Sequence, residues 1–137
     1  MKKLSLALLV VILVLACRQK PVVAIQPGPA FIEFSDSLLT GEFGTVSKQK
    51  QPSYTYDFRF VNKGSEPLVI NKVEPNCTCI DADFPKQPIK PGEEGKIQVK
   101  LHVDELPDGF VCRSVMVYNT SKNYPVVRLQ LEGIVEE

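Results

Sequence analysis

Four cysteines, at positions 17, 77, 79 and 112, are the residues of this 137-residue chain whose side chains offer the most chemistry. Cys77 and Cys79 are separated only by Thr78. Thiols form disulfides, bind soft metal ions or act as nucleophiles, and the compartment matters because disulfides persist in oxidising surroundings. The other residues must therefore show where the protein resides and how the cysteines are held.

Enzymatic interpretations of these cysteines find little support in the spacing. A thioredoxin-like dithiol has two intervening residues at a helix start, where the helix lowers a thiol pKa. Cys77 and Cys79 have one, and they follow an apolar, strand-like stretch. A cysteine nucleophile needs a base. The single histidine, His102, has the outward parity of an alternating strand, which is typical of a solvated surface residue. We therefore expect no catalytic residues and no enzyme.

Metal binding is the main chemical alternative. A structural zinc site needs four ligands, and Cys77, Cys79, Cys112 and His102 reach that number, but no pattern makes them converge. Cu(I) prefers soft sulfur ligands, which Cys77 and Cys79, with Met116, would supply. The main expectation is that the protein has no cofactor and no metal. A thiol-based copper-binding or redox protein using Cys77 and Cys79 is kept as the alternative.

The N-terminal residues predict export and lipidation. A cationic start, Met1-Lys2-Lys3, precedes the apolar run 4–15, whose length of about twelve residues is too short for a hydrocarbon core that needs roughly 20. The run ends Val14-Leu15-Ala16-Cys17, which resembles a bacterial lipobox. The resemblance implies a signal peptide over residues 1–16 and a diacylglycerol on Cys17, with a further acyl chain such as palmitate.

Residues 17–29 are then expected to be the lipidated N-terminus and a proline-containing tether; an ordered strand through residues 22–25 is the alternative. We expect a bacterial membrane-anchored lipoprotein, most simply in the outer membrane, facing the periplasm or the cell surface. Sixteen basic and sixteen acidic residues give no net charge, so nothing indicates nucleic-acid binding. No small-molecule substrate is implied.

Residues 30–137 predict one all-β domain. Alternation is clearest in residues 53–61, where Tyr54, Tyr56, Phe58 and Phe60 share one side, which we expect to be buried. Further strands are expected at residues 31–34, 43–46, 68–70, 97–103, 111–119 and 126–135. About seven short strands, with turns between them and no helical period, indicate an immunoglobulin-like antiparallel β-sandwich.

Several motifs together resemble a known family. They are, in order, Phe58-x-Phe60-x-Asn62-x-Gly64, Pro67-Leu68-x-Ile70, Cys77-x-Cys79, Ile89-x-Pro91-Gly92-Glu93-x-Gly95 and Leu131-x-Gly133-x-Val135. This order is similar to a bacterial domain-of-unknown-function family, common in Bacteroidetes lipoproteins, that is marked by a Cys-Gly-Cys-Thr motif. The resemblance implies an immunoglobulin-like sandwich related to PapD-type chaperones and to ASH and MSP domains. Thr78 and Ile80 stand where that motif has glycine and threonine.

Cysteines of an exported protein can form disulfides, so the pairing of Cys77, Cys79 and Cys112 has to be considered. Residues two apart in a strand lie near the Cα distance limit for bridging, which disfavours a bond between Cys77 and Cys79. In an immunoglobulin-like sheet, the strand before Cys77 and the strand starting at Cys112 are antiparallel neighbours. We therefore predict a disulfide from Cys112 to either Cys77 or Cys79, with three free thiols as the competing outcome.

The sequence thus predicts a lipid-anchored, non-enzymatic binding or assembly module of the bacterial cell envelope. Related sandwiches bind proteins by adding a strand at a sheet edge, so the expected partners are the membrane, through Cys17, and another envelope protein.

Overall fold

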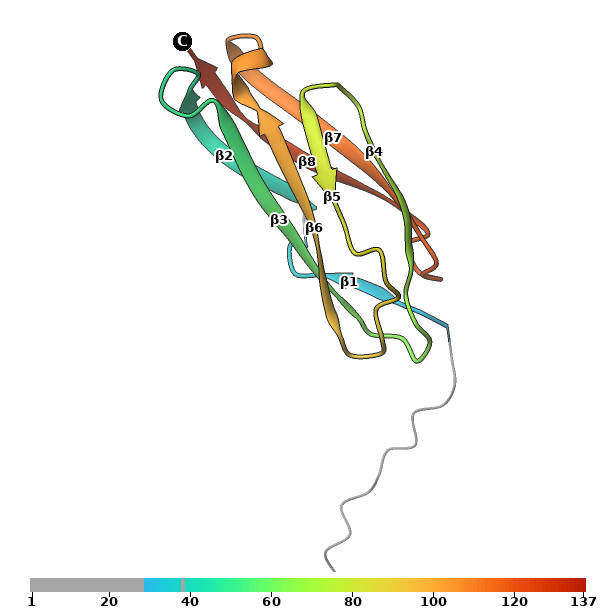
Figure 1. Ribbon diagram of the computed structural model, residues 1–137. Helices are drawn as coiled ribbons and strands as arrows, with labels where there is room; N and C mark the ends of the chain where they lie inside the picture. The colour runs from blue at the N-terminus through green and yellow to red at the C-terminus, as the bar shows by residue number, and fades with distance from the viewer. Residues whose placement is uncertain (1–28, 38) are drawn as a thin grey trace, which may run out of the picture.

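The computed structural model describes residues 29–37 and 39–137. The described residues form eight strands and one short 3-10 turn (Figure 1). They are β1 (Ile32–Phe34), β2 (Thr40–Ser47), β3 (Ser53–Asn62), β4 (Ile70–Pro75), β5 (Ile80–Asp83), β6 (Glu94–His102), η1 (Val103–Glu105), β7 (Gly109–Asn119) and β8 (Val126–Glu136). Within this part of the chain, no helix is long and apolar enough to cross a membrane.

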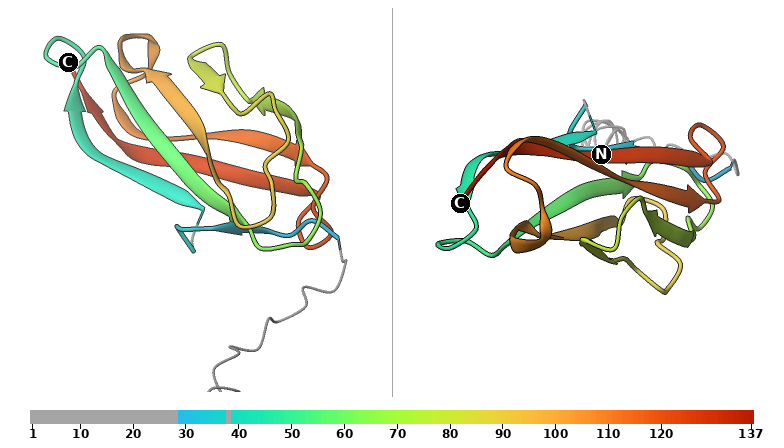
Figure 2. Two further views of the ribbon diagram at one scale, coloured as in Figure 1. Left: turned by 60° about the horizontal axis from the view of Figure 1, so that its bottom comes forward. Right: turned by 90° about the horizontal axis from the view of Figure 1, so that it is seen from above.

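The strands pack as two four-stranded sheets, which confirms the predicted all-β, immunoglobulin-like sandwich. One sheet has the order β1-β3-β6-β5 and the other β2-β8-β7-β4. The view from above shows the two layers facing each other (Figure 2). All pairs are antiparallel except β2 with β8, which are parallel.

The parallel pair arises because the N-terminal edge of the domain is divided between the sheets. β1 pairs with β3 in one sheet, and the chain then crosses to pair β2 with β8 in the other. Leu39, just before β2, has a φ of 55°, a left-handed conformation that is unusual for a branched side chain. The crossing leaves β2 paired only with residues 130–136 of β8.

The core lies between the long central strands. Phe58 and Phe60 on β3 are each 1 % exposed, and Ile97, Val99 and Leu101 alternate inward from β6. The buried aromatic side that the sequence predicted is therefore confirmed. Tyr54 and Tyr56 share this parity but are half-buried, and the rings of Tyr56 and Phe58 are in contact.

One predicted strand needs correction, and one observed strand was not expected. Leu68 forms only an isolated bridge with Ile89, and the strand itself is β4, which begins at Ile70. β5 was not predicted, because four residues are too few for a clear period. Ile80 and Ala82 on β5 turn toward the core side, whereas the Asp81 and Asp83 side chains leave it.

Candidate functional site

Cys77 and Cys79 form a disulfide with each other, in the turn that carries the chain from β4 in one sheet to β5 in the other. This turn lies at the upper end of the sandwich in Figure 1. Cys79 is buried, Cys77 is half-buried and Thr78 is exposed. The predicted bond from Cys112 to either of them is therefore wrong.

The turn explains why the two cysteines meet. In an extended strand, residues two apart are separated by about 6.6 Å between Cα atoms. Here the Cα atoms of Cys77 and Cys79 are 5.2 Å apart, within the range of ordinary disulfides. The expectation that Cys77 and Cys79 do not pair rested on strand geometry, but the strand ends at Pro75 and the two cysteines lie in the turn that follows.

Cys112 is a free thiol, and it lies on the outer face of its sheet, away from the core. Its neighbours Val111 and Val115 point into the core, so the alternation of β7 turns Cys112 outward. There its Sγ accepts a hydrogen bond from Gln130 Nε2 at 3.3 Å. β4 and β7 are indeed antiparallel neighbours, as expected, but the parity of Cys112 prevents pairing. That parity could have been read from the sequence.

The observed disulfide contributes little to stability through chain entropy. The closed loop contains only three residues, counting both cysteines, for which loop-closure entropy gives roughly 1.6 kcal/mol, against about 3.8 kcal/mol for the loop to Cys112. It also joins no segments that are distant in the sequence. Global stabilisation is therefore a weak explanation for these two cysteines.

The structure also places the remaining residues that the sequence singled out. The His102 ring lies outward, as predicted, but its Nε2 is 2.8 Å from Asp81 Oδ2 rather than simply solvated. Among residues 29–37 and 39–137, no group of three or more His, Cys, Asp or Glu side chains could hold a metal ion. Cys17 lies outside the described residues.

A second candidate site is a groove of about 440 Å³ between β1 and the start of β8. Its lining is partly apolar and combines residues from both sheets and from the β7–β8 loop: Phe31, Ile32, Glu33, Phe34, Asp36, Ser37, Leu39, Lys63, Asn123, Tyr124 and Val127. Tyr124 is 59 % exposed and Val126 next to the groove is 47 % exposed.

The groove exists because β8 extends beyond β2. Pairing with β2 starts at Gln130, whose backbone N–H donates to Leu39 O, so Val126–Leu129 have no β2 partner. In an extended strand every second residue directs its N–H and C=O to the same side. Because Gln130 directs its N–H toward β2, the N–H and C=O of Arg128 face the same, open side of β8, and those of the odd-numbered residues face β7.

Three other edge strands, β1, β4 and β5, carry features that discourage strand addition. The Asn123 side chain accepts from Ile32 N–H and donates to Ile32 O, so it occupies the free side of β1 like a short strand. β4 has a bulge and ends in Pro75, and β5 is only four residues long. We call the side of β8 at Arg128, beyond the end of β2, the stepped edge. Among the described residues, nothing covers or interrupts it.

The chain can be assigned to a protein family. Residues 32–135 match the family described as "Protein of unknown function (DUF1573)". The chain belongs to the DUF1573 family. No curated protein matches the chain closely enough to add a function.

Three solved structures resemble this DUF1573 domain. A protein of unknown function from Porphyromonas gingivalis W83 aligns with a TM-score of 0.64 at 13% identity over 83% of this chain and 51% of that one. The ASH/PapD-like domain 7 of human CEP192 gives 0.53 at 14% over 87% and 93%. The YadV chaperone gives 0.52 at 16% over 80% and 53%. This chain thus spans about half of the Porphyromonas protein, and these likenesses show the PapD-like, immunoglobulin-type fold alone.

The structure explains several motif residues of this DUF1573 chain at the lower end of the sandwich. Asn62 is fully buried; its Oδ1 accepts from Gly64 N–H, and its Nδ2 donates to Glu66 O and Ile89 O. A Cβ on Gly95 would meet the Phe60 ring at 2.5 Å. These residues join the end of β3 to the β3–β4 turn, to the β5–β6 connection and to the start of β6, which is a structural role.

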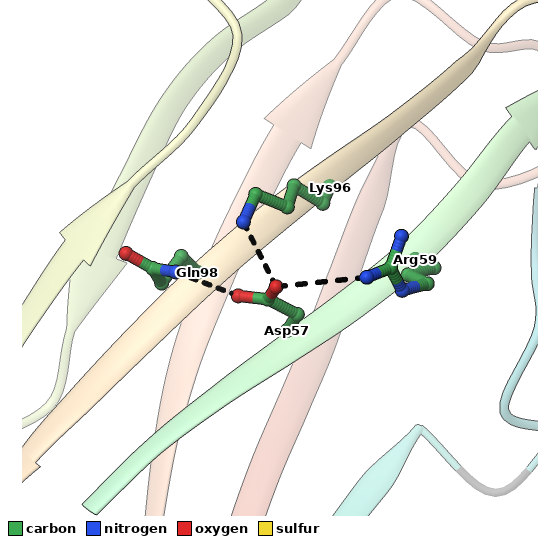
Figure 3. A network of polar contacts seen from close by, with 4 residues as sticks. All are labelled: Asp57, Arg59, Lys96 and Gln98. Atoms are coloured by element: carbon green, nitrogen blue, oxygen red, sulfur yellow. Dashed lines mark hydrogen bonds and ion pairs between the residues drawn. The ribbon is translucent and has the colours of Figure 1, made fainter.

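The outer faces of the two sheets of the DUF1573 domain differ in character. On the β3–β6 face, Asp57 accepts from Lys96 Nζ and Gln98 Nε2, both at 2.8 Å, with Arg59 nearby (Figure 3). The hydrogen bond from Lys96, and then that from Gln98, lowers the pKa of Asp57. On the other sheet, Phe110 and Ile134 are paired across β7 and β8 and are 70 % and 45 % exposed.

Proposed function

We propose that this DUF1573 protein is a non-enzymatic, lipid-anchored binding module of the bacterial cell envelope, which takes up an extended segment of another envelope protein. The observation that carries the proposal is the stepped edge of β8 beside the groove. Strand backbone that has no partner among residues 29–37 and 39–137, next to a partly apolar groove, is the arrangement that β-strand addition requires.

The chemistry of the groove specifies the occupant. Arg128 offers an N–H and a C=O to a new strand, and the neighbouring β2 shows that this side of β8 already accepts a parallel partner. Phe31, Phe34 and Val127 provide the apolar lining. We therefore infer an extended peptide with alternating apolar side chains, one set of which enters the groove.

The anchor supports the envelope location. The lipobox-like sequence before Cys17 provides the reason to place the domain on a bacterial membrane, in the outer membrane facing the periplasm or the cell surface. The PapD-like fold supports a protein partner, since that fold includes the YadV chaperone. Neither the stepped edge nor the groove presents a set of catalytic groups, so binding is the proposed role.

The test uses short random peptides displayed on phage, selected against the purified protein. We expect selected peptides to alternate apolar and polar residues and to slow amide hydrogen exchange at Arg128. The variant Arg128→Pro should weaken their binding about tenfold, because it removes one edge-facing N–H without removing a bond to β7.

The matched control is Arg128→Ala, which retains the N–H and should bind as the unmodified protein does. Hydrogen exchange in the unmodified protein keeps the proposal testable if the proline variant folds poorly. Selected peptides that leave the Arg128 amide unprotected, or that bind around Phe110 and Ile134, would overturn the proposed site.

A further inference from the structure

We propose that the Cys77–Cys79 disulfide is a redox-active site that exchanges with the dithiol of an exported polypeptide. This goes beyond the binding role and relies on different residues. Its basis is the position of the disulfide: a turn whose two ends are fixed to different sheets by hydrogen bonds that do not involve sulfur.

The first end of the turn is held by β7. Asn76 N–H donates to Ser114 O at 3.0 Å, and Ser114 N–H donates to Asn76 Oδ1 at 3.1 Å. The second end is held by β6, where His102 N–H donates to Cys79 O at 2.8 Å. Because these bonds are independent of the disulfide, reduction should leave Cys77 and Cys79 within bridging distance. A dithiol that stays assembled can be reoxidised without refolding.

The two sulfur positions differ in burial, which assigns their roles. Cys77 is half-buried and follows exposed Asn76, whereas Cys79 is buried against the core. A thiolate from outside therefore reaches Cys77 more readily, with Cys79 as the leaving group.

The exchange balances without another cofactor. A substrate thiolate attacks Cys77 Sγ, the Cys77–Cys79 bond breaks, and Cys79 takes the electron pair as a thiolate. The second substrate thiol then attacks the mixed disulfide, which gives an oxidised substrate and two reduced cysteines. Two electrons and two protons have passed to the protein, and a second disulfide, such as glutathione disulfide, returns the site to its oxidised form.

The arrangement of the molecule makes this end accessible. Pro29, the first described residue, lies at the opposite end, where its carbonyl accepts from Ser65 N–H beside the β3–β4 turn (Figure 1). A chain anchored through its N-terminus would present the cysteine turn away from the anchor. Cys112 faces the outer side of its sheet and takes no part.

The test uses the purified protein with Cys17→Ser and Cys112→Ser, equilibrated with reduced and oxidised glutathione, alkylated and analysed by mass spectrometry. We expect glutathione to reduce Cys77–Cys79 in the folded state, with circular dichroism unchanged. A structural disulfide resists the glutathione pool. A bond that opens only on unfolding would therefore overturn the proposal.

Trapping with reduced ribonuclease A as the dithiol distinguishes the two cysteines. Each single-cysteine variant is first oxidised with glutathione and then added to reduced ribonuclease A. The Cys79→Ser variant should form a mixed disulfide with ribonuclease A through Cys77. The Cys77→Ser variant should form at least about tenfold less of the corresponding mixed disulfide. Equal trapping by both variants would contradict the assigned roles. Reduced protein that binds Cu(I) but shows no exchange would overturn the proposal in favour of a soft-metal site.

Discussion

Adjacent residues of β3 have opposite roles, which shows how much one step of register decides. Phe58 is buried against the core, and its neighbour Asp57 lies on the outer face among Lys96, Gln98 and Arg59 (Figure 3). A one-residue slip would bury the carboxylate and expose the ring. Each side of the strand can be tested by a single substitution.

Phe58→Ala should lower the free energy of unfolding by roughly 3–5 kcal/mol, because it removes a fully buried ring from the centre of the core. Chemical denaturation followed by circular dichroism measures the change. Thr55→Ala, at an exposed position of the same strand, is the control and should change stability little. A loss below about 1 kcal/mol for Phe58→Ala would mean that this side chain is not a core residue.

Asp57→Asn should reduce stability near neutral pH, and the difference from the unmodified protein should shrink in acid. The lowered pKa of Asp57 means that its stabilising contribution is present above the ordinary carboxyl value of 3.8 and is lost as the pH falls through the lower folded value. Urea unfolding at a series of pH values measures this. Asp104→Asn controls for loss of a charge; a difference for Asp57→Asn that stays constant with pH would refute the linkage.

At the scale of elements, the β3–β4 turn holds the first described segment onto the sandwich. Gly64 lies directly under residues 29–31, and a Cβ there would meet Pro29 O at 2.3 Å and Phe31 N at 2.5 Å. Lys63 N–H donates to Phe31 O, and Lys122 N–H donates to Ala30 O. Glycine is required here by the close approach of backbone rather than by its φ.

Gly64→Ala should therefore displace residues 29–31 and cost about 1–3 kcal/mol, the range typical of overpacking. Amide hydrogen exchange at Lys63 and Lys122 should become faster, since both donate to the displaced carbonyls. Lys63→Ala, which adds no atom beneath the segment, is the control for side-chain changes in this turn. Unchanged exchange at Lys122 would show that the segment tolerates the methyl group.

At the scale of the whole molecule, the two candidate sites lie at opposite ends. The groove involves Phe31, Lys63 and Tyr124, near the start of the described chain, and the disulfide lies beyond β4 at the other end. A lipid on Cys17 would place the groove nearer the membrane and the disulfide farther from it. The anchor itself lies outside the described residues and needs its own test.

Cys17→Ser should release the protein from the membrane fraction or block its processing, because the substitution removes the sulfur that would carry the lipid. Fractionation of cells followed by mass spectrometry of the N-terminal peptide measures both effects. Cys112→Ser is the matched control and should leave the protein with the membrane. Membrane-bound protein with an unmodified Cys17 would contradict lipidation.

The sequence by itself determined the fold class and the main core. Period-two alternation on β3 and β6 requires one buried face, so Phe58, Phe60, Ile97 and Val99 were predictable without coordinates. Asn62 and Gly64, between the predicted strands 53–61 and 68–70, are also residue types that favour a turn. These features are local, because strand periodicity and turn chemistry depend on residues close together in the sequence.

Only the tertiary structure decided the cysteine pairing and the open edge. Cys77 and Cys79 meet because the chain turns between sheets, and the neighbouring strands, which bond to Asn76 and Cys79, set that turn. The open edge at Arg128 depends on where β2 stops pairing, which follows from the crossing at Leu39. Both result from contacts between residues far apart in sequence, which periodicity cannot report.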